Sequence, residues 1–107
     1  MIHLAERFEF MDVNEIRTIL YGVMQKMIPQ EERLKKLWQN GRSLPLTGEQ
    51  WGFDGIHLTY LFLEVENVFQ IKISPKFVTN YQFNTIDSIV NIVAHYLPVT
   101  NRKEAAK

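Results

Sequence analysis

Apolar side chains recur every three to four residues in the first part of the chain, which predicts a long amphipathic helix. Asp12 is a good N-cap residue, and Glu15 stands three residues later, in the capping-box position. The helix is therefore expected from about residue 13 to residue 27. Its apolar positions are Val13, Ile16, Ile19, Leu20, Val23, Met24 and Met27.

A second, shorter helical pattern follows Pro29, because proline is tolerated in the first turn of a helix but not in its interior. It covers residues 30–39 and ends at Asn40-Gly41. We expect Gly41 to adopt the left-handed conformation that often follows a helix end. The apolar side chains of this extra helix are Leu34, Leu37 and Trp38.

The remainder of the chain predicts an anchored loop and two further helices. Proline and glycine punctuate residues 42–53, so this segment is a loop whose Leu44, Leu46, Trp51 and Phe53 could anchor it to a core. Asp54 then caps a helix over residues 55–69, and Thr85 caps a last helix that stops at Pro98. Between these helices we expect an extended stretch and a short irregular or single-turn segment.

These elements predict one all-α domain of 107 residues. Residues 1–11 form an N-terminal extension that could be a short strand or a helical turn. Residues 12–97 form the helical bundle, and residues 98–107 are expected to be a flexible tail.

The helix over residues 55–69 carries apolar side chains on two opposite faces. One face is the expected core stripe, with Leu58, Leu61, Phe62, Val65, Val68 and Phe69. The opposite face holds Ile56, Tyr60, Leu63 and Asn67, where an exposed helix normally carries charge. Either the first residues of the chain or the extra helix covers this second stripe, or it is a surface for a partner or a second copy.

Charge and cysteine content narrow the function classes. Twelve Lys and Arg residues balance twelve Asp and Glu residues, so no basic excess favours a nucleic acid or an acidic membrane surface. No stretch approaches the roughly 18 apolar residues of a membrane span. The chain has no cysteine, which excludes disulfides and thiol catalysis and fits a cytoplasmic location.

Three motifs stand in register between about residues 44 and 97. They are W-G-F-D-G-I-H-L, L-E-V-E-N-V-F-Q-I-K-I-S-P and F-N-T-I-D-S-I-V-N-I-V. Together they resemble the acyl carrier and peptidyl carrier protein family, whose central helix begins with L-G-x-D-S-L. The resemblance implies a four-helix bundle, to which residues 30–39 add an extra short helix. The pattern is also similar to carrier-related proteins of bacterial peptide-maturation systems.

The attachment position departs from this family. The resemblance implies that the residue after the motif aspartate, Asp54, should be a serine whose hydroxyl receives phosphopantetheine. That residue is Gly55, which has no side-chain oxygen, so no phosphodiester can form there and no cofactor is expected. His57 and Tyr60 also replace two acidic docking residues of the family, so we expect the usual partner enzymes to bind poorly.

The histidines predict no metal site. They occur at His3, His57 and His95, without the H-x-x-x-H spacing that often supplies a local pair of ligands. Asp54 and His57 lie three residues apart on a first helical turn and could hydrogen-bond. We interpret them as a solvent-facing capping pair rather than as a general base.

The chain has three serines, and none lies in a G-x-S-x-G nucleophile motif. Ser43 is in the loop, Ser74 precedes a proline, and Ser88 is in the first turn of the last helix. Ser43 is the least unfavourable alternative site for a prosthetic group.

These observations favour a non-catalytic, carrier-like docking or adaptor module in a peptide or natural-product biosynthesis or maturation system. It is expected to bind a biosynthetic or peptide-modifying enzyme. The first alternative is an atypical carrier, modified at another serine or holding its ligand non-covalently; the second is a small enzyme that uses His57 and Asp54. The expected partner-binding residues are Ile56, His57, Tyr60, Leu63, Trp51 and Phe53.

Overall fold

The computed structural model describes residues 11–97. The predicted tail and all but the last residue of the predicted extension lie outside this range. Within it the chain forms five helices and no strands, so the all-α prediction is confirmed. The helices are α2 (Val13–Met27), α3 (Glu31–Asn40), α4 (Gly55–Phe69), α5 (Lys76–Thr79) and α6 (Ile86–Tyr96).

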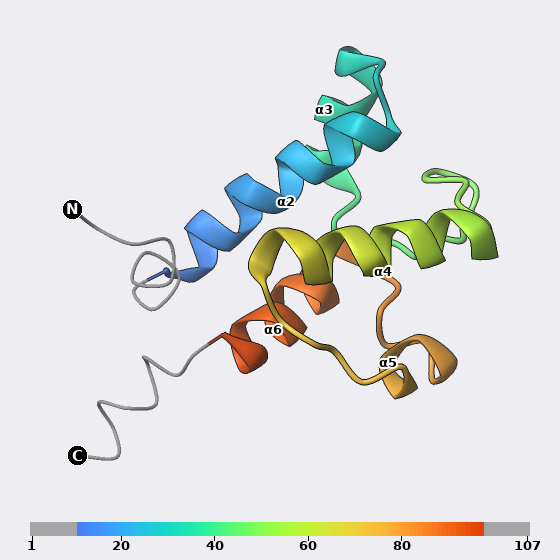
Figure 1. Ribbon diagram of the computed structural model, residues 1–107. Coiled ribbons are helices and arrows are strands. Elements are labelled where there is room, and N and C mark those ends of the chain that lie inside the picture. The colour runs from blue at the N-terminus through green and yellow to red at the C-terminus, as the bar shows by residue number, and fades with distance from the viewer. Residues whose placement is uncertain (1–10, 98–107) are drawn as a thin grey trace.

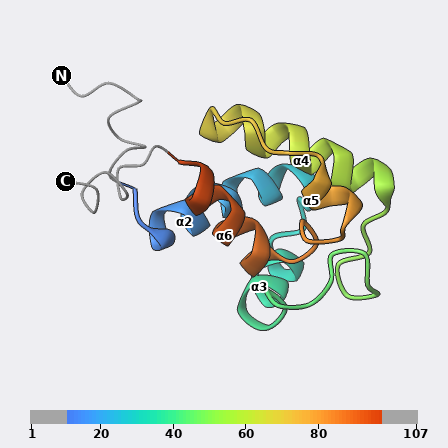
Figure 2. The same cartoon turned by 90° about the horizontal axis from the view of Figure 1, so that it is seen from below.

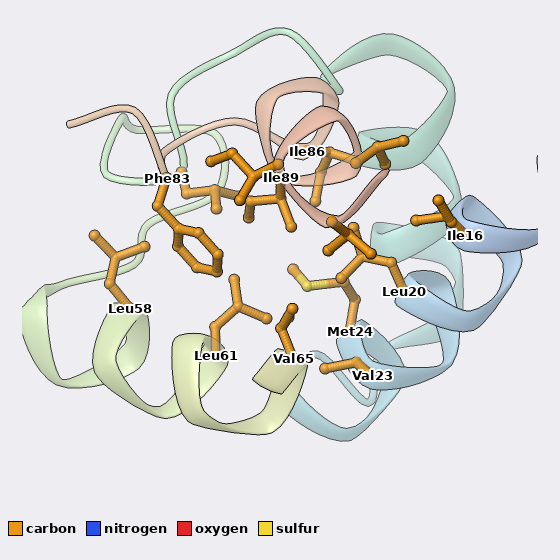
Figure 3. Close-up of a cluster of buried hydrophobic side chains, with 14 of the residues drawn as sticks. Ile16, Leu20, Val23, Met24, Leu58, Leu61, Val65, Phe83, Ile86 and Ile89 are labelled. Atoms are coloured by element: carbon orange, nitrogen blue, oxygen red, sulfur yellow. The ribbon is translucent and has the colours of Figure 1, made fainter. Parts of the chain in front are cut away.

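The core lies among α2, α4 and α6. Helix α2 packs against α3, α4 and α6, and Figure 1 shows the three long helices around one centre. Figure 3 shows their apolar side chains converging, with Phe83 entering from the segment before α6. Removing these side chains from water is the main favourable contribution to folding. The fully buried core residues include Ile16, Leu20, Met24, Leu61, Val65, Phe69, Phe83, Ile86 and Ile89.

Local capping explains where the long helices begin. The Asp12 carboxylate accepts a 2.9 Å hydrogen bond from the Glu15 N–H, and the Glu15 carboxylate accepts one of 2.9 Å from the Asp12 N–H. At α6 the Thr85 hydroxyl accepts a 2.9 Å hydrogen bond from the Ser88 N–H. Asp54 caps α4 in the same way, so the predicted starts of α2, α4 and α6 are confirmed. None of the helices within residues 11–97 has both the length and the apolar character needed to cross a membrane.

Helix α3 packs onto α2. Leu34 is buried, and the Trp38 ring meets Tyr21 of α2 edge to face at a centroid distance of 5.0 Å. Figure 2 shows α3 and α4 at opposite edges of the fold. The extra helix thus covers one side of α2 and leaves the outer side of α4 uncovered.

A network of long-range contacts fixes the loop between α3 and α4. The buried Trp51 indole N–H donates a 2.8 Å hydrogen bond to the Gly41 carbonyl. The Arg33 guanidinium donates to the Gln50 and Trp51 carbonyls, at 3.2 and 3.1 Å. The Leu46 N–H also donates to the Asn84 carbonyl, at 2.7 Å. The loop is therefore held to α3 and to the segment before α6, and it delivers the chain to the start of α4.

Gly41 does not adopt the predicted left-handed conformation, because its φ is −124°. Its small size serves a close approach instead. A Cβ atom here would lie 3.0 Å from the Leu37 carbonyl oxygen and 3.4 Å from the Trp51 indole nitrogen. The glycine allows the indole to reach the backbone at the end of α3.

Two glycine-to-alanine variants test this interpretation. Gly41→Ala should lower the free energy of unfolding by about 1–3 kcal/mol, since the new methyl group crowds backbone and indole. Gly22→Ala in α2 is the matched control, because no atom lies within 4 Å of the added Cβ. It should raise stability by about 0.5–1 kcal/mol. Urea unfolding followed by circular dichroism measures both values. If the two substitutions changed the free energy of unfolding equally, the proposed crowding at Gly41 would be wrong.

Candidate functional site

The start of α4 is built around Asp54 and His57. The Asp54 carboxylate accepts a 2.9 Å hydrogen bond from the His57 N–H and lies 2.8 Å from the ring nitrogen Nδ1. A carboxylate only accepts, so the short ring contact requires the proton to be on Nδ1. The 3.4 Å approach of the Asp54 N–H to this nitrogen is then not an effective hydrogen bond. The two side chains form a capping pair, as the sequence predicted.

These hydrogen bonds favour the charged form of the aspartate. The His57 N–H, and then its ring, lower the pKa of Asp54 below the ordinary value. Asp54 therefore stays ionised and keeps capping α4 at more acidic pH than a free aspartate would. The His57 ring also stacks on Phe53, with centroids 5.4 Å apart. The contacts of His57 with Asp54 and with Phe53 thus both stabilise the first turn of α4.

Gly55, the first residue of α4, is exposed, and no atom lies within 4 Å of a Cβ built there. Its φ lies outside the left-handed region that favours glycine. Neither space nor backbone conformation therefore demands a glycine. A serine side chain would be accommodated at this position.

The second face of α4 is exposed. Ile56, Tyr60 and Leu63, called the apolar stripe below, are 79%, 50% and 56% exposed. The extra helix packs on α2 instead, so the interpretation in which Leu34, Leu37 and Trp38 cover the stripe is wrong. The first ten residues lie outside the described part of the chain. Contiguous exposed apolar side chains are typical of interaction surfaces.

The C-terminal end of α2 borders the apolar stripe. Lys26 forms a 2.8 Å salt bridge with Glu64 on the flank of α4, and this contact raises the pKa of Lys26. A shallow depression of about 340 Å³ lies between Lys26, Met27, Ile56, His57 and Tyr60. The stripe therefore has an apolar depression beside it and a charged edge.

Trp51 and Phe53 do not belong to this surface. They are only 1% and 7% exposed, which corrects their prediction as docking residues. Their alternative prediction, as anchors of the loop, is confirmed by the Trp51 hydrogen bond and by edge-to-face packing of the two rings at 6.1 Å. Their large apolar areas are better buried in a small core than left in water.

The structure does not bring the other candidate residues together. Ser43 is exposed in the loop, the Ser74 hydroxyl accepts a 3.2 Å hydrogen bond from the Lys76 N–H, and Ser88 lies within α6. None of the three is at the start of α4. His3 lies outside the described range. Over residues 11–97 there is no group of three or more His, Asp or Glu side chains that could hold a metal ion.

The Lys26–Glu64 salt bridge was not predicted from the sequence. The two residues are 38 positions apart in the sequence, so the spacing of neighbouring residues could not predict this contact. The same holds for Arg33, whose bonds to the loop carbonyls span 17 and 18 positions. Only the apposition of α2 with α4, and of α3 with the loop, creates these contacts.

Comparisons of the chain with protein-family models, with curated proteins and with solved structures found no match. The geometry of α4 is therefore the basis for any statement about function.

A pair of lysine variants tests whether the apolar stripe is surface. Leu63→Lys should change the free energy of unfolding by no more than about 0.5 kcal/mol, because the residue is largely exposed. Leu61→Lys, two positions away in the core, should cost at least about 4 kcal/mol through burial of an unpaired charge. Thermal and urea unfolding by circular dichroism compare them. A Leu63→Lys variant as unstable as Leu61→Lys would show that the stripe is core.

Proposed function

We propose that this protein is a non-catalytic docking module that binds a biosynthetic or peptide-modifying enzyme through α4. The observation that carries the proposal is the exposed apolar stripe, which begins directly after the empty attachment position Gly55. A docking helix commonly offers apolar anchors at positions i, i+4 and i+7, and Ile56, Tyr60 and Leu63 have this spacing.

The scaffold supports a carrier-like design. The three long helices α2, α4 and α6, with the short α5 between the last two, follow the order expected from the carrier resemblance. In this proposal they are the four helices of a carrier-like bundle, and α3 is an addition. Asp54 caps α4 immediately before Gly55, as the motif aspartate would before the serine.

The chemistry at Gly55 supports a module without a covalent cargo. A phosphodiester to a prosthetic group needs a side-chain oxygen, and glycine has none. The exposed surface beyond Gly55 is then free to act through contact alone. We accordingly propose an adaptor or structural subunit in a peptide or natural-product biosynthesis or maturation system.

The charges beside the stripe indicate a different kind of partner from that of acidic carriers. Glu64 is paired with Lys26, and His57 is paired with Asp54, so the flank offers compensated charges instead of a run of free carboxylates. Electrostatic complementarity therefore favours a partner whose docking surface is apolar over a partner whose docking surface is strongly basic.

Site-specific photo-crosslinking in cells of the organism that makes this protein tests the docking proposal. A photoreactive phenylalanine analogue in place of Tyr60 should yield a specific adduct with one heterologous protein. The same analogue at Tyr81, which is 76% exposed on the segment after α5, is the control and should not. Leu63→Lys should reduce the adduct at position 60 roughly tenfold or more, since it puts a charge into the apolar contact. Equal adducts at positions 60 and 81 would overturn the proposal.

Modification in vitro tests the absence of a prosthetic arm. With coenzyme A and a broad-specificity phosphopantetheinyl transferase, the native chain should keep its intact mass. The Gly55→Ser variant should gain one phosphopantetheine group, because the position has space for the side chain.

Modification of the native chain, at Ser43, Ser74 or Ser88, would favour the atypical carrier instead. A Gly55→Ser variant that stays unmodified would remove the support that the carrier resemblance lends to the proposal.

A further inference from the structure

The outward residues of α4 have the spacing of a helix-pairing seam. Ile56, Tyr60, Leu63 and Asn67 follow one another at intervals of four, three and four, and all four are exposed. This alternation keeps one line of side chains facing a second helix over about three turns. Asn67 is the polar residue at the C-terminal end of this line, and the three residues before it form the apolar stripe.

An antiparallel pair of identical α4 helices matches this seam to itself. A two-fold axis that places Tyr60 opposite Leu63 of a second copy also places Ile56 opposite Asn67 of that copy. Each apolar contact then occurs twice, as a two-fold interface requires. The two central pairs each join an aromatic ring with a leucine, and the polar asparagines lie at the rim.

The same arrangement brings a histidine and a carboxylate of different copies together along one edge. His57 and Glu64 flank the seam on the same side, seven residues apart. The antiparallel axis brings His57 of each copy towards Glu64 of the other. When both ring nitrogens of His57 carry a proton, the Nδ1–H binds Asp54 and the Nε2–H can donate to this carboxylate. Glu64 would then bridge Lys26 of its own chain and His57 of the second copy.

We infer that the apolar stripe pairs with the stripe of a second copy of this chain, antiparallel along α4, to form a weak two-fold dimer. Three partly exposed apolar side chains supply at most a few hundred Å² on each copy, which is the range of transient interfaces. The dissociation constant is therefore expected to be on the order of 0.1 mM.

The proposed dimer rests on the same surface as the proposed function, so a second copy of the chain competes with the partner enzyme. A dimer covers Ile56, Tyr60 and Leu63, so a partner enzyme must displace the second copy. The tests remain separable, because dimerisation is measured with the purified chain and docking with a heterologous partner in cells.

Sedimentation equilibrium of the full chain from about 10 µM to about 1 mM tests self-association. The weight-average mass should rise from that of one chain towards that of two, and Leu63→Lys should remain monomeric throughout. A native chain that stays monomeric at the highest concentration, or a Leu63→Lys variant that still dimerises, would overturn the inference.

A charge swap tests the antiparallel register independently of the apolar contacts. His57→Glu should raise the dissociation constant roughly tenfold, because a carboxylate then meets Glu64 of the second copy. The fold should be retained, since glutamate is the usual third helical residue of a capping box, as Asp12 and Glu15 show in α2. Adding Glu64→Lys to His57→Glu should restore association. Association unchanged by His57→Glu, or not recovered in the double variant, would refute this register.

Crosslinking tests the proposed antiparallel register directly. The chain lacks cysteine, so introduced thiols react alone. In a mixture of His57→Cys and Glu64→Cys chains, a short bismaleimide should join one chain of each kind. Preferential joining of Glu64→Cys chains to each other would be incompatible with this antiparallel register and would overturn the proposal.

Discussion

The buried hydrogen bond from the Trp51 indole to the Gly41 carbonyl is the interaction on which the geometry of the site depends. It links the loop to the end of α3, and the Arg33 guanidinium bonds add a second link between the same elements. The Gly41 carbonyl also accepts a 3.0 Å hydrogen bond from the Leu44 N–H, so it serves as a shared acceptor. A buried indole N–H without an acceptor would be costly, so this bond allows Trp51 to fill the core. The loop in turn sets where Asp54 lies relative to α3, and hence where the first turn of α4 is placed in the fold.

Helix α4 carries two apolar faces because it has two kinds of neighbours. Its inner face contributes Leu58, Leu61 and Val65 to the core shared with α2 and α6 (Figure 3). None of the other described helices packs over its outer face, since α3 packs on α2 and only the C-terminal end of α2, at Lys26 and Met27, borders this face. The outer apolar residues add little to the stability of a single chain. Their exposure is instead consistent with association, which is the basis of both proposals.

The contrast between Gly55 and its surroundings limits the proposed mechanism. A capped helix start, an exposed position and space for a side chain are all present at Gly55, whereas glycine itself has no side-chain oxygen. The proposed module accordingly acts by reversible contact, with affinity set by a small apolar area and a few compensated charges. In this view self-pairing and partner binding use one surface, so protein concentration regulates how much of it is free.

Much of the fold could be predicted from local patterns. Helical periodicity and the caps at Asp12, Asp54 and Thr85 determined the helix starts, because these interactions join residues within one turn. The absence of an oxygen at position 55 is likewise a property of the sequence alone. The second apolar face of α4 could be recognised, but its exposure could not.

Tertiary structure decided everything that depends on which elements meet. It placed α3 on α2, so that no helix within residues 11–97 covers the apolar stripe. It also buried Trp51 and Phe53, which as loop residues could equally have been exposed. It also gave Gly41 a packing role in place of a left-handed turn. The physical reason is that burial and long-range contacts are set by the packing of distant segments, about which the spacing of neighbouring residues carries no information.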